Sequence, residues 1–127
     1  MDEAIGHWQK WAALSPQDAQ AHYNLGKALL HKLRTQEAIA CFQKALEVQP
    51  DNAEVLFYWG SASVLQGKLE EAQTLLLEAL RLKTGYAEAR CKLGNVMELR
   101  GSIDEALPHY LEAVKLDPRN AEGHYYL

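Results

Sequence analysis

Apolar side chains recur along this chain with the three- and four-residue spacing that keeps them on one face of an α-helix. One such series contains Leu25, Ala28 and Leu29, and a second series follows a largely polar stretch at 32–36. The members of the second series are Ala38, Ile39, Phe42, Ala45 and Leu46. The pattern predicts a helix, a short turn and another helix whose apolar faces pack together.

The helix–turn–helix pattern repeats, because small residues return at a fixed interval of 34 positions. A constant period of this length is typical of stacked repeat units. Two helices approach to about 8 Å only where the side chains at their crossing are small, so we expect these residues at helix–helix contacts. They are Gly26, Gly60 and Gly94 on the first helix of each unit, and Ala38, Ala45, Ala72, Ala79, Ala106 and Ala113 on the second.

The period predicts an all-α solenoid, a single domain built by stacking antiparallel helix pairs. We expect repeat 1 at 19–52, repeat 2 at 53–86 and repeat 3 at 87–120. Residues 1–18 are expected to form the second helix of a preceding incomplete repeat, and residues 121–127 the start of a further first helix.

Local signals mark the turns inside the units. Gly67 and Gly101 follow first helices and supply the left-handed conformation that commonly ends a helix, whereas the first unit has Leu33 at this place. Ser102, followed three residues later by Glu105, predicts a capping box for the next helix.

Prolines mark two other places. Pro50 discourages a helical conformation at the residue before it, and Asp51 or Asn52 can cap the helix that follows. Pro108 falls inside a predicted second helix just past its first turn, where we expect a slight bend and no break.

The repeated positions closely resemble the tetratricopeptide repeat, whose pattern places a Leu-Gly pair, alanines, aromatics and a proline at set offsets. The resemblance covers 19–120 and is carried by Leu25-Gly26, Ala38, Phe42, Ala45 and Pro50 in the first unit and by Leu93-Gly94, Ala106, Tyr110, Ala113 and Pro118 in the third. The middle unit lacks the proline, and all three units lack the early aromatic, having His22, Leu56 and Arg90. The resemblance implies a right-handed superhelix whose concave wall binds an extended or helical peptide from another protein.

Composition and charge argue against several classes of partner. A net charge of −4 and a pI near 5.7 disfavour nucleic acid, because neutralising phosphates requires a basic face. No apolar run approaches the roughly 18 residues that a membrane span requires, and the acidic start Asp2-Glu3 lacks the pattern of a secretory signal. Cys41 and Cys91 fit thiols in a reducing compartment, so we expect a cytoplasmic protein with no membrane partner.

Patterns for catalysis and metal binding are missing from the sequence. The five histidines form no HxxxH or HExxH pair, and no phosphate-binding loop, GxSxG elbow or Cys-His pairing signal is present. Glu70-Glu71 and Asp104-Glu105 begin second helices, where they favour the helix dipole and face solvent. We therefore expect no metal, no cofactor and no enzymatic activity.

The concave wall should be formed by first-helix side chains that point away from the core. A projection with the period of about 3.6 residues places this face opposite Leu25, Gly26 and Leu29. Two tyrosines on this face, Tyr58 and Tyr126, either offer contact area with a polar tip, as interface residues do, or merely cover the seams between helices. The expected partner-binding residues are Asn24, Lys27, His31, Tyr58, Ser61, Leu65, Lys92, Asn95 and Tyr126.

Two specialised functions of the family do not fit this wall. Relatives that grip the C-terminal carboxylate of heat-shock chaperones use Lys, Asn and Arg on three successive first helices. The corresponding positions here hold Tyr23, Lys27, Tyr58, Glu88 and Lys92. Acidic side chains along the wall oppose a carboxylate ligand, so binding of a chaperone tail is not expected. An asparagine ladder like that of a protein glycosyltransferase needs four asparagines, and only Asn24 supplies one.

A peptide-binding adaptor is the leading interpretation, and two others stay open. One is a substrate-recognition segment of a larger enzyme such as a glycosyltransferase. The other is head-to-tail self-assembly, because a leading helix with Trp8 and Trp11 and a trailing segment with Tyr125, Tyr126 and Leu127 offer apolar surface.

Overall fold

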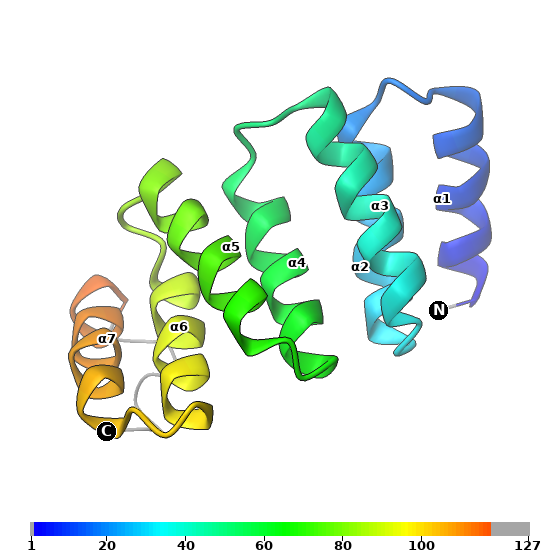
Figure 1. Ribbon diagram of the computed structural model, residues 1–127. Helices are drawn as coiled ribbons and strands as arrows, with labels where there is room; N and C mark the ends of the chain where they lie inside the picture. Colours follow the sequence, from blue (N-terminus) through cyan, green and yellow to red (C-terminus); the bar gives the residue numbers. More distant parts are fainter. Residues whose placement is uncertain (1, 118–127) are drawn as a thin grey trace.

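The computed structural model describes residues 2–117, which form helices joined by short turns (Figure 1). The helices are α1 (Asp2–Leu14), α2 (Ala19–His31), α3 (Thr35–Val48), α4 (Ala53–Leu65), α5 (Leu69–Leu82), α6 (Ala87–Leu99) and α7 (Ile103–Leu116). No strand occurs in this part of the chain, which confirms the predicted all-α class. The first helix expected to start at 121–127 lies outside the described residues.

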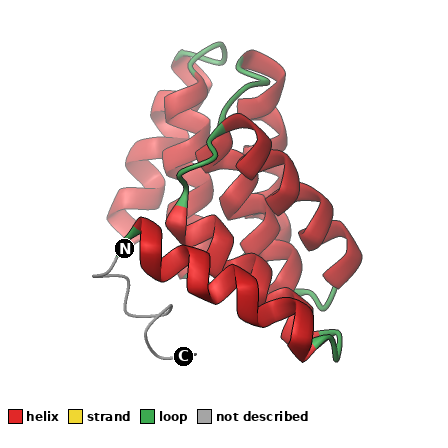
Figure 2. Ribbon diagram, turned by 90° about the vertical axis from the view of Figure 1, so that its left-hand side faces the viewer, coloured by secondary structure: helices red, strands yellow, loops and turns green. Residues whose placement is uncertain are grey.

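The helices stack as antiparallel pairs in a single row (Figures 1 and 2). The most extensive contacts join α2 to α3, α4 to α5 and α6 to α7, and each pair also contacts the next one. The helices α2, α4 and α6 begin at Ala19, Ala53 and Ala87, an interval of 34 residues. The described chain is therefore a solenoid of helix pairs, as the sequence predicts.

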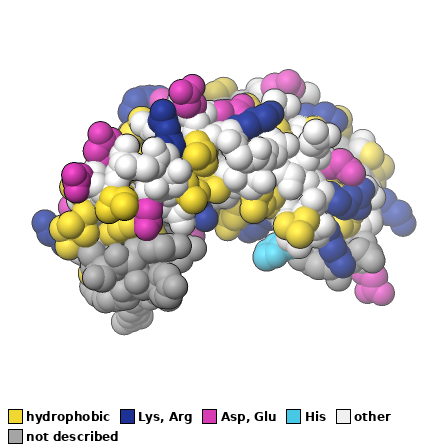
Figure 3. All heavy atoms as spheres, turned by 60° about the horizontal axis from the view of Figure 1, so that its bottom comes forward, with side chains coloured by type: hydrophobic (Ala, Val, Ile, Leu, Met, Phe, Trp, Pro, Cys, Tyr) yellow, Lys and Arg dark blue, Asp and Glu magenta, His cyan; other side chains and the backbone are white. Residues whose placement is uncertain are grey.

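The row is curved, with α2, α4 and α6 on its inner side. α2 contacts α4 and α4 contacts α6, whereas no contact of this extent joins α3 to α5 or α5 to α7. In a curved array, the helices that touch their counterparts in the next pair are those on the inside of the curve. Figure 3 shows the array as an arch. We call the exposed inner surface of 19–31, 53–65 and 87–99 the groove.

Close packing between neighbouring helices depends on glycine and alanine. A Cβ atom added to Gly26 would lie 2.5 Å from Cε1 of Phe42, and one added to Gly94 would lie 2.8 Å from Cε1 of Tyr110. Either distance is too short for a real contact, so any side chain at these positions would displace an aromatic ring. Six alanines of the second helices are at most 1% exposed: Ala38, Ala45, Ala72, Ala79, Ala106 and Ala113.

The turns inside the pairs share a left-handed residue. Gly67 has a φ of 74° and Gly101 a φ of 84°, so the expected left-handed ends are confirmed. Leu33 adopts the same conformation with a φ of 60°, although its Cβ makes this conformation cost roughly 1–2 kcal/mol. The turn geometry is thus common to the three pairs, and the first pair forms it with a strained residue.

The helix caps agree with the sequence at one place and differ at another. Asn52 Oδ1 accepts a hydrogen bond from the Val55 N–H at 3.2 Å, as expected for a capping asparagine. The capping box predicted for Ser102 and Glu105 is wrong, since the Ser102 side chain makes no capping hydrogen bond. A capping box also needs the Ser102 N–H, but the tight turn directs this group to a carbonyl near the end of α6 at 2.8 Å. α7 continues through Pro108 without a break, as expected.

Candidate functional site

The structure distributes the expected binding residues along the groove. Tyr58 and Ser61 lie on α4, and Lys92 lies on α6, all half-buried. His31 and Leu65 are the last residues of their helices and are exposed beside the turns. The remaining described members, Asn24, Lys27 and Asn95, are half-buried, and Tyr126 lies outside the described residues.

A hollow of about 440 Å³ lies in the groove where the three first helices meet. It is lined by Leu30, Phe57, Tyr58, Ser61, Glu88, Lys92 and Asp117. Of the expected residues, it thus brings together Tyr58, Ser61 and Lys92, whereas Asn24, Lys27, His31, Leu65 and Asn95 do not line it. The hollow contains two carboxylates and one ammonium group, so its net charge does not favour an acidic ligand.

The sequence did not single out every lining residue. Leu30 was not among the expected groove residues, and Asp117 follows α7 rather than a first helix. Glu88 was expected on the wall as an acidic residue that opposes a carboxylate ligand, and Glu54 stands 34 residues before it on the same helix face. Asp117 has no signal of this kind, because it follows a second helix and its place in the hollow depends on how α7 packs on α6.

Tyr58 is the centre of an aromatic cluster that joins the groove to the core. Its ring centroid lies 5.7 Å from that of Tyr23, 5.1 Å from that of Phe57 and 6.3 Å from that of Phe42. The Tyr23 and Phe57 rings meet it edge to face, a favoured arrangement for aromatic pairs. These neighbours on both sides fix the orientation of Tyr58 before any ligand arrives.

Two lysines lie over tyrosine rings, one in the groove and one in the turn between α5 and α6. The Nζ atom of Lys27 is 4.7 Å from the ring centroid of Tyr23 and 5.5 Å from that of Tyr58. Lys83 Nζ lies 4.5 Å from the Tyr86 ring centroid and also donates a hydrogen bond to Glu54 at 3.1 Å. Cation–π contacts of this length are attractive, so the free protein places its own cations on these rings.

Burial and neighbouring acids keep the groove tyrosines neutral. Burial raises the pKa of Tyr23, and Tyr58, Glu54 and Glu88 raise it further. Burial and then Glu88 raise the pKa of Tyr58. Both phenols therefore keep their protons at physiological pH and present hydroxyl donors and acceptors beside their apolar rings.

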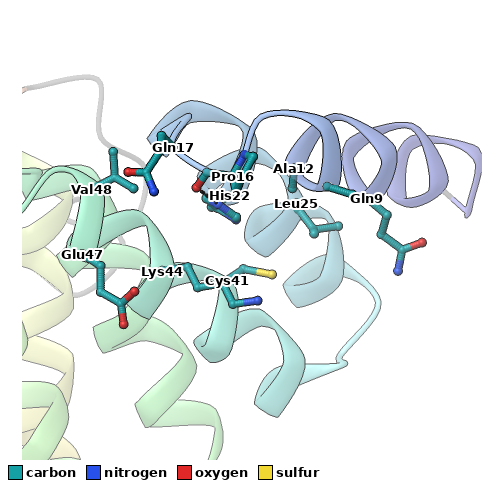
Figure 4. A pocket seen from close by; sticks show the side chains of 11 residues that line it. Gln9, Ala12, Pro16, Gln17, His22, Leu25, Cys41, Lys44, Glu47 and Val48 are labelled. Carbon is teal, nitrogen blue, oxygen red and sulfur yellow. Dashed lines mark hydrogen bonds between the residues drawn. The ribbon is translucent and has the colours of Figure 1, made fainter.

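A larger hollow of about 660 Å³ lies between α1 and α3, with α2 as its floor. Figure 4 shows its lining side chains, which come from these helices and the turn after α1. A nitrogen of the His22 ring is 2.9 Å from the Pro16 carbonyl, and burial raises the pKa of the Cys41 thiol. A protonated thiol is a poor nucleophile, so Cys41 is not activated for catalysis, and we take the aromatic groove as the candidate site.

Residues 2–117 contain no group of three or more side chains placed to hold a metal ion. None of their helices is long and apolar enough to cross a membrane.

Comparisons with known proteins agree with the architecture. A family model described as tetratricopeptide repeat matches residues 19–52, and one described as TPR repeat matches residues 99–127. No curated protein sequence matches the chain significantly.

Several solved structures share the fold. The crystal structure of MamA superimposes with a TM-score of 0.88 and 26% identity, over 98% of this chain and 73% of that one. The first TPR domain of Spaghetti (RPAP3), bound to the HSP90 peptide SRMEEVD, gives a TM-score of 0.81 at 24% identity, over 86% of each chain. The OM64 TPR domain of Arabidopsis gives 0.82 at 17% identity, over 85% of this chain and 89% of that one. The glycine–aromatic crossings and helix pairs agree with the two repeat models, so the described chain has the fold of a tetratricopeptide repeat array.

Proposed function

We propose that the chain is a protein-interaction scaffold whose groove binds a peptide segment of another protein and catalyses no reaction. The observation that carries the proposal is the hollow of about 440 Å³ with Tyr58 at its edge. A peptide needs a concave apolar surface with a few polar groups that fix its register, and this hollow combines Leu30 and Phe57 with Ser61 and Lys92. The two repeat models and the shared fold support the coarser part of the proposal, an interaction scaffold.

The proposal excludes the acidic tail of heat-shock chaperones as the ligand. A carboxylate clamp requires cations that converge on one point. Glu88 and Asp117 instead share the hollow with Lys92, and Lys27 lies over tyrosine rings. The peptide SRMEEVD, labelled with a fluorophore, should therefore show no saturable change in anisotropy with this protein. Saturable binding that Lys92→Glu abolishes would overturn the exclusion.

Affinity capture tests the groove. The purified chain captures partners from a lysate of its source, mass spectrometry identifies them, and the bound segment is then measured as a synthetic peptide. Tyr58→Ala and Lys92→Glu should each weaken that peptide roughly tenfold or more, since buried aromatic and charged contacts at an interface centre carry most of the affinity.

A matched control lies outside the groove. Leu77 is 46% exposed on α5, so Leu77→Ala removes a similarly accessible apolar side chain without touching the hollow. Circular dichroism confirms that each variant folds. Retained affinity in Leu77→Ala with loss in both groove variants supports the proposal, and equal affinity in all four proteins refutes it.

A second candidate function is head-to-tail self-association, favoured by apolar side chains on the outer faces of α1 and α7. Leu14 is 84% exposed beside Trp11, and Ile103, Leu107 and Leu111 form an exposed stripe on α7 at helical spacing. Lys10 and Asp104 add opposite charges to the two faces. Sedimentation velocity should show mass that grows with concentration and is reduced by Leu107→Glu. A monomer at all concentrations rejects this candidate.

A further inference from the structure

The groove contains a pair of tyrosine rings arranged to hold a cation. The rings of Tyr23 and Tyr58 meet at 63° with their centroids 5.7 Å apart, so together they form two walls of a corner. One ring comes from α2 and the other from α4, and the contact between these helices holds the corner open. Aromatic faces carry negative electrostatic potential, which attracts ammonium and guanidinium groups.

In the free protein this corner is filled by a side chain of the same chain. Lys27 Nζ lies 4.7 Å from one ring centroid and 5.5 Å from the other. Lys27 stands one helical turn after Tyr23 on α2, so its stem needs only to lie along the helix to reach both rings. The geometry thus shows directly which chemical group the corner accepts.

Two carboxylates near the corner strengthen its preference for positive charge. Glu54 and Glu88 both lie close enough to act electrostatically on Tyr23, and Glu88 also acts on Tyr58. Glu54 is engaged by Lys83 at 3.1 Å, whereas Glu88 lines the hollow that Tyr58 also borders. A cation at the corner is therefore attracted by Glu88, which lines the same hollow as Tyr58, and an anion there is repelled.

We infer that the peptide bound by the groove carries a basic side chain, which displaces Lys27 from the corner between Tyr23 and Tyr58 and pairs with Glu88. The inference deepens the proposed peptide-binding function and rests on it. Two cations cannot share the corner, so Lys27 must move to solvent, where its flexible stem allows it to be hydrated. Arginine is the favoured ligand residue, because its planar guanidinium stacks on a ring while donating two hydrogen bonds to a carboxylate.

Lys27 is on this view a specificity-determining residue that competes with the ligand. A ligand must bind the corner more strongly than Lys27 does in order to displace it, and Lys27 balances the charge of Glu88 when no ligand is bound. Removing its charge should therefore strengthen the binding of basic peptides, the opposite of what a direct contact residue would do. This sign separates the inference from a merely structural role for Lys27.

Capped tripeptides provide the test. The ¹⁵N-labelled protein is titrated with acetyl-Gly-Arg-Gly-amide, and amide shifts are followed at Tyr58 and Glu88, with glutamine and glutamate versions as controls. We expect the arginine peptide to shift both amides in the millimolar range and the glutamate peptide to leave them unchanged. Lys27→Met should tighten the arginine peptide roughly two- to fivefold, the range of an exposed cation–π contact, and Glu88→Gln should weaken it by a similar factor.

The outcomes are decisive in both directions. Equal binding of the arginine and glutamate peptides, or weaker arginine binding in Lys27→Met, overturns the inference. If the captured partner depends on Tyr58 while no arginine peptide binds, the inference fails and the proposed function stands. If the arginine peptide binds the corner while partner capture ignores Tyr58 and Lys92, the proposed function fails and the cation site stands.

Discussion

Replacing Gly26 with alanine tests the packing on which the solenoid depends. The new Cβ would lie 2.5, 2.8 and 3.0 Å from three atoms of the Phe42 ring. Phe42 has no exposed surface, so the ring has no free space in which to withdraw. The helices α2 and α3 must then separate, or the ring must leave its preferred rotamer.

Two opposing contributions set the change in the free energy of unfolding that Gly26→Ala causes. Overpacking a filled core costs typically about 1–3 kcal/mol, and a rigid ring at these distances belongs in the upper half of that range. Alanine is better than glycine inside a helix by about 1 kcal/mol, which offsets part of the cost. We expect Gly26→Ala to lower the free energy of unfolding by about 1–2 kcal/mol.

Two other glycines provide matched controls for the same substitution. At Gly60 the nearest atom is Leu76 Cγ at 3.1 Å, and a leucine side chain can shift, so the two terms should cancel to within about 0.5 kcal/mol. At Gly6 on α1 nothing lies within 4 Å, so alanine should raise the free energy of unfolding by up to about 1 kcal/mol. The predicted order of stability is therefore Gly6→Ala, then Gly60→Ala, then Gly26→Ala.

Urea unfolding followed by far-UV circular dichroism measures all three variants, with the slope m compared to confirm the same transition. Combining Gly26→Ala with Phe42→Leu should recover most of the loss caused by the alanine alone, since the middle pair already combines a leucine with its glycine. A Gly26→Ala variant as stable as Gly6→Ala would refute the argument that this glycine permits the helix contact.

Three further predictions concern turns, caps and charge. Leu33→Gly should raise the free energy of unfolding by about 0.5–1 kcal/mol, because the residue is 73% exposed and left-handed, and no gain would contradict the strain. Asn52→Ala should cost about 1 kcal/mol and Ser102→Ala less than about 0.5, since of these two side chains only Asn52 accepts a capping hydrogen bond, so equal losses in urea unfolding would count against this assignment. Burial alone would raise the pKa of Glu54, but hydrogen bonds from its own backbone and from Lys83 hold this pKa below its usual value. The Glu54–Lys83 pair therefore stabilises the fold fully at pH values above the usual pKa of a glutamate, and its contribution is lost as the pH falls through the lowered pKa. Lys83→Met should therefore raise the pKa of Glu54 in an NMR titration, and an unchanged pKa would exclude the pair as a cause.

The fold was predictable because its determinants recur at one interval. Gly26 and Gly94 face aromatic rings of the partner helices in the structure, and the alanines at the same period are buried. Each of these residues satisfies a steric requirement at a contact between helices that are neighbours in the row. A period in the sequence is sufficient to reveal a requirement of that kind.

Details that depend on competition between local groups were not predictable. Ser102 and Glu105 have the right spacing for a capping box, but the turn after Gly101 uses the Ser102 N–H in another hydrogen bond. Leu33 takes a left-handed conformation that its residue type disfavours, because the turn geometry is imposed by the packed helices on both sides. In both cases tertiary packing decided between local alternatives that the sequence leaves open.

The groove shows why the partner is harder to predict than the fold. The positions at the interval of 34 on its wall hold Asn24, Tyr58 and Lys92, three different chemistries, so no period describes them. Yet Tyr58 is held by Phe42 of the core as well as by Tyr23 in the groove, at 6.3 and 5.7 Å. A ring fixed in this way loses little conformational entropy when a ligand packs on it, so more of the contact energy is available as affinity. The packing that defines the solenoid thus also preorganises Tyr58 for binding. A substitution at Phe42 should therefore weaken peptide binding, although Phe42 is buried in the core.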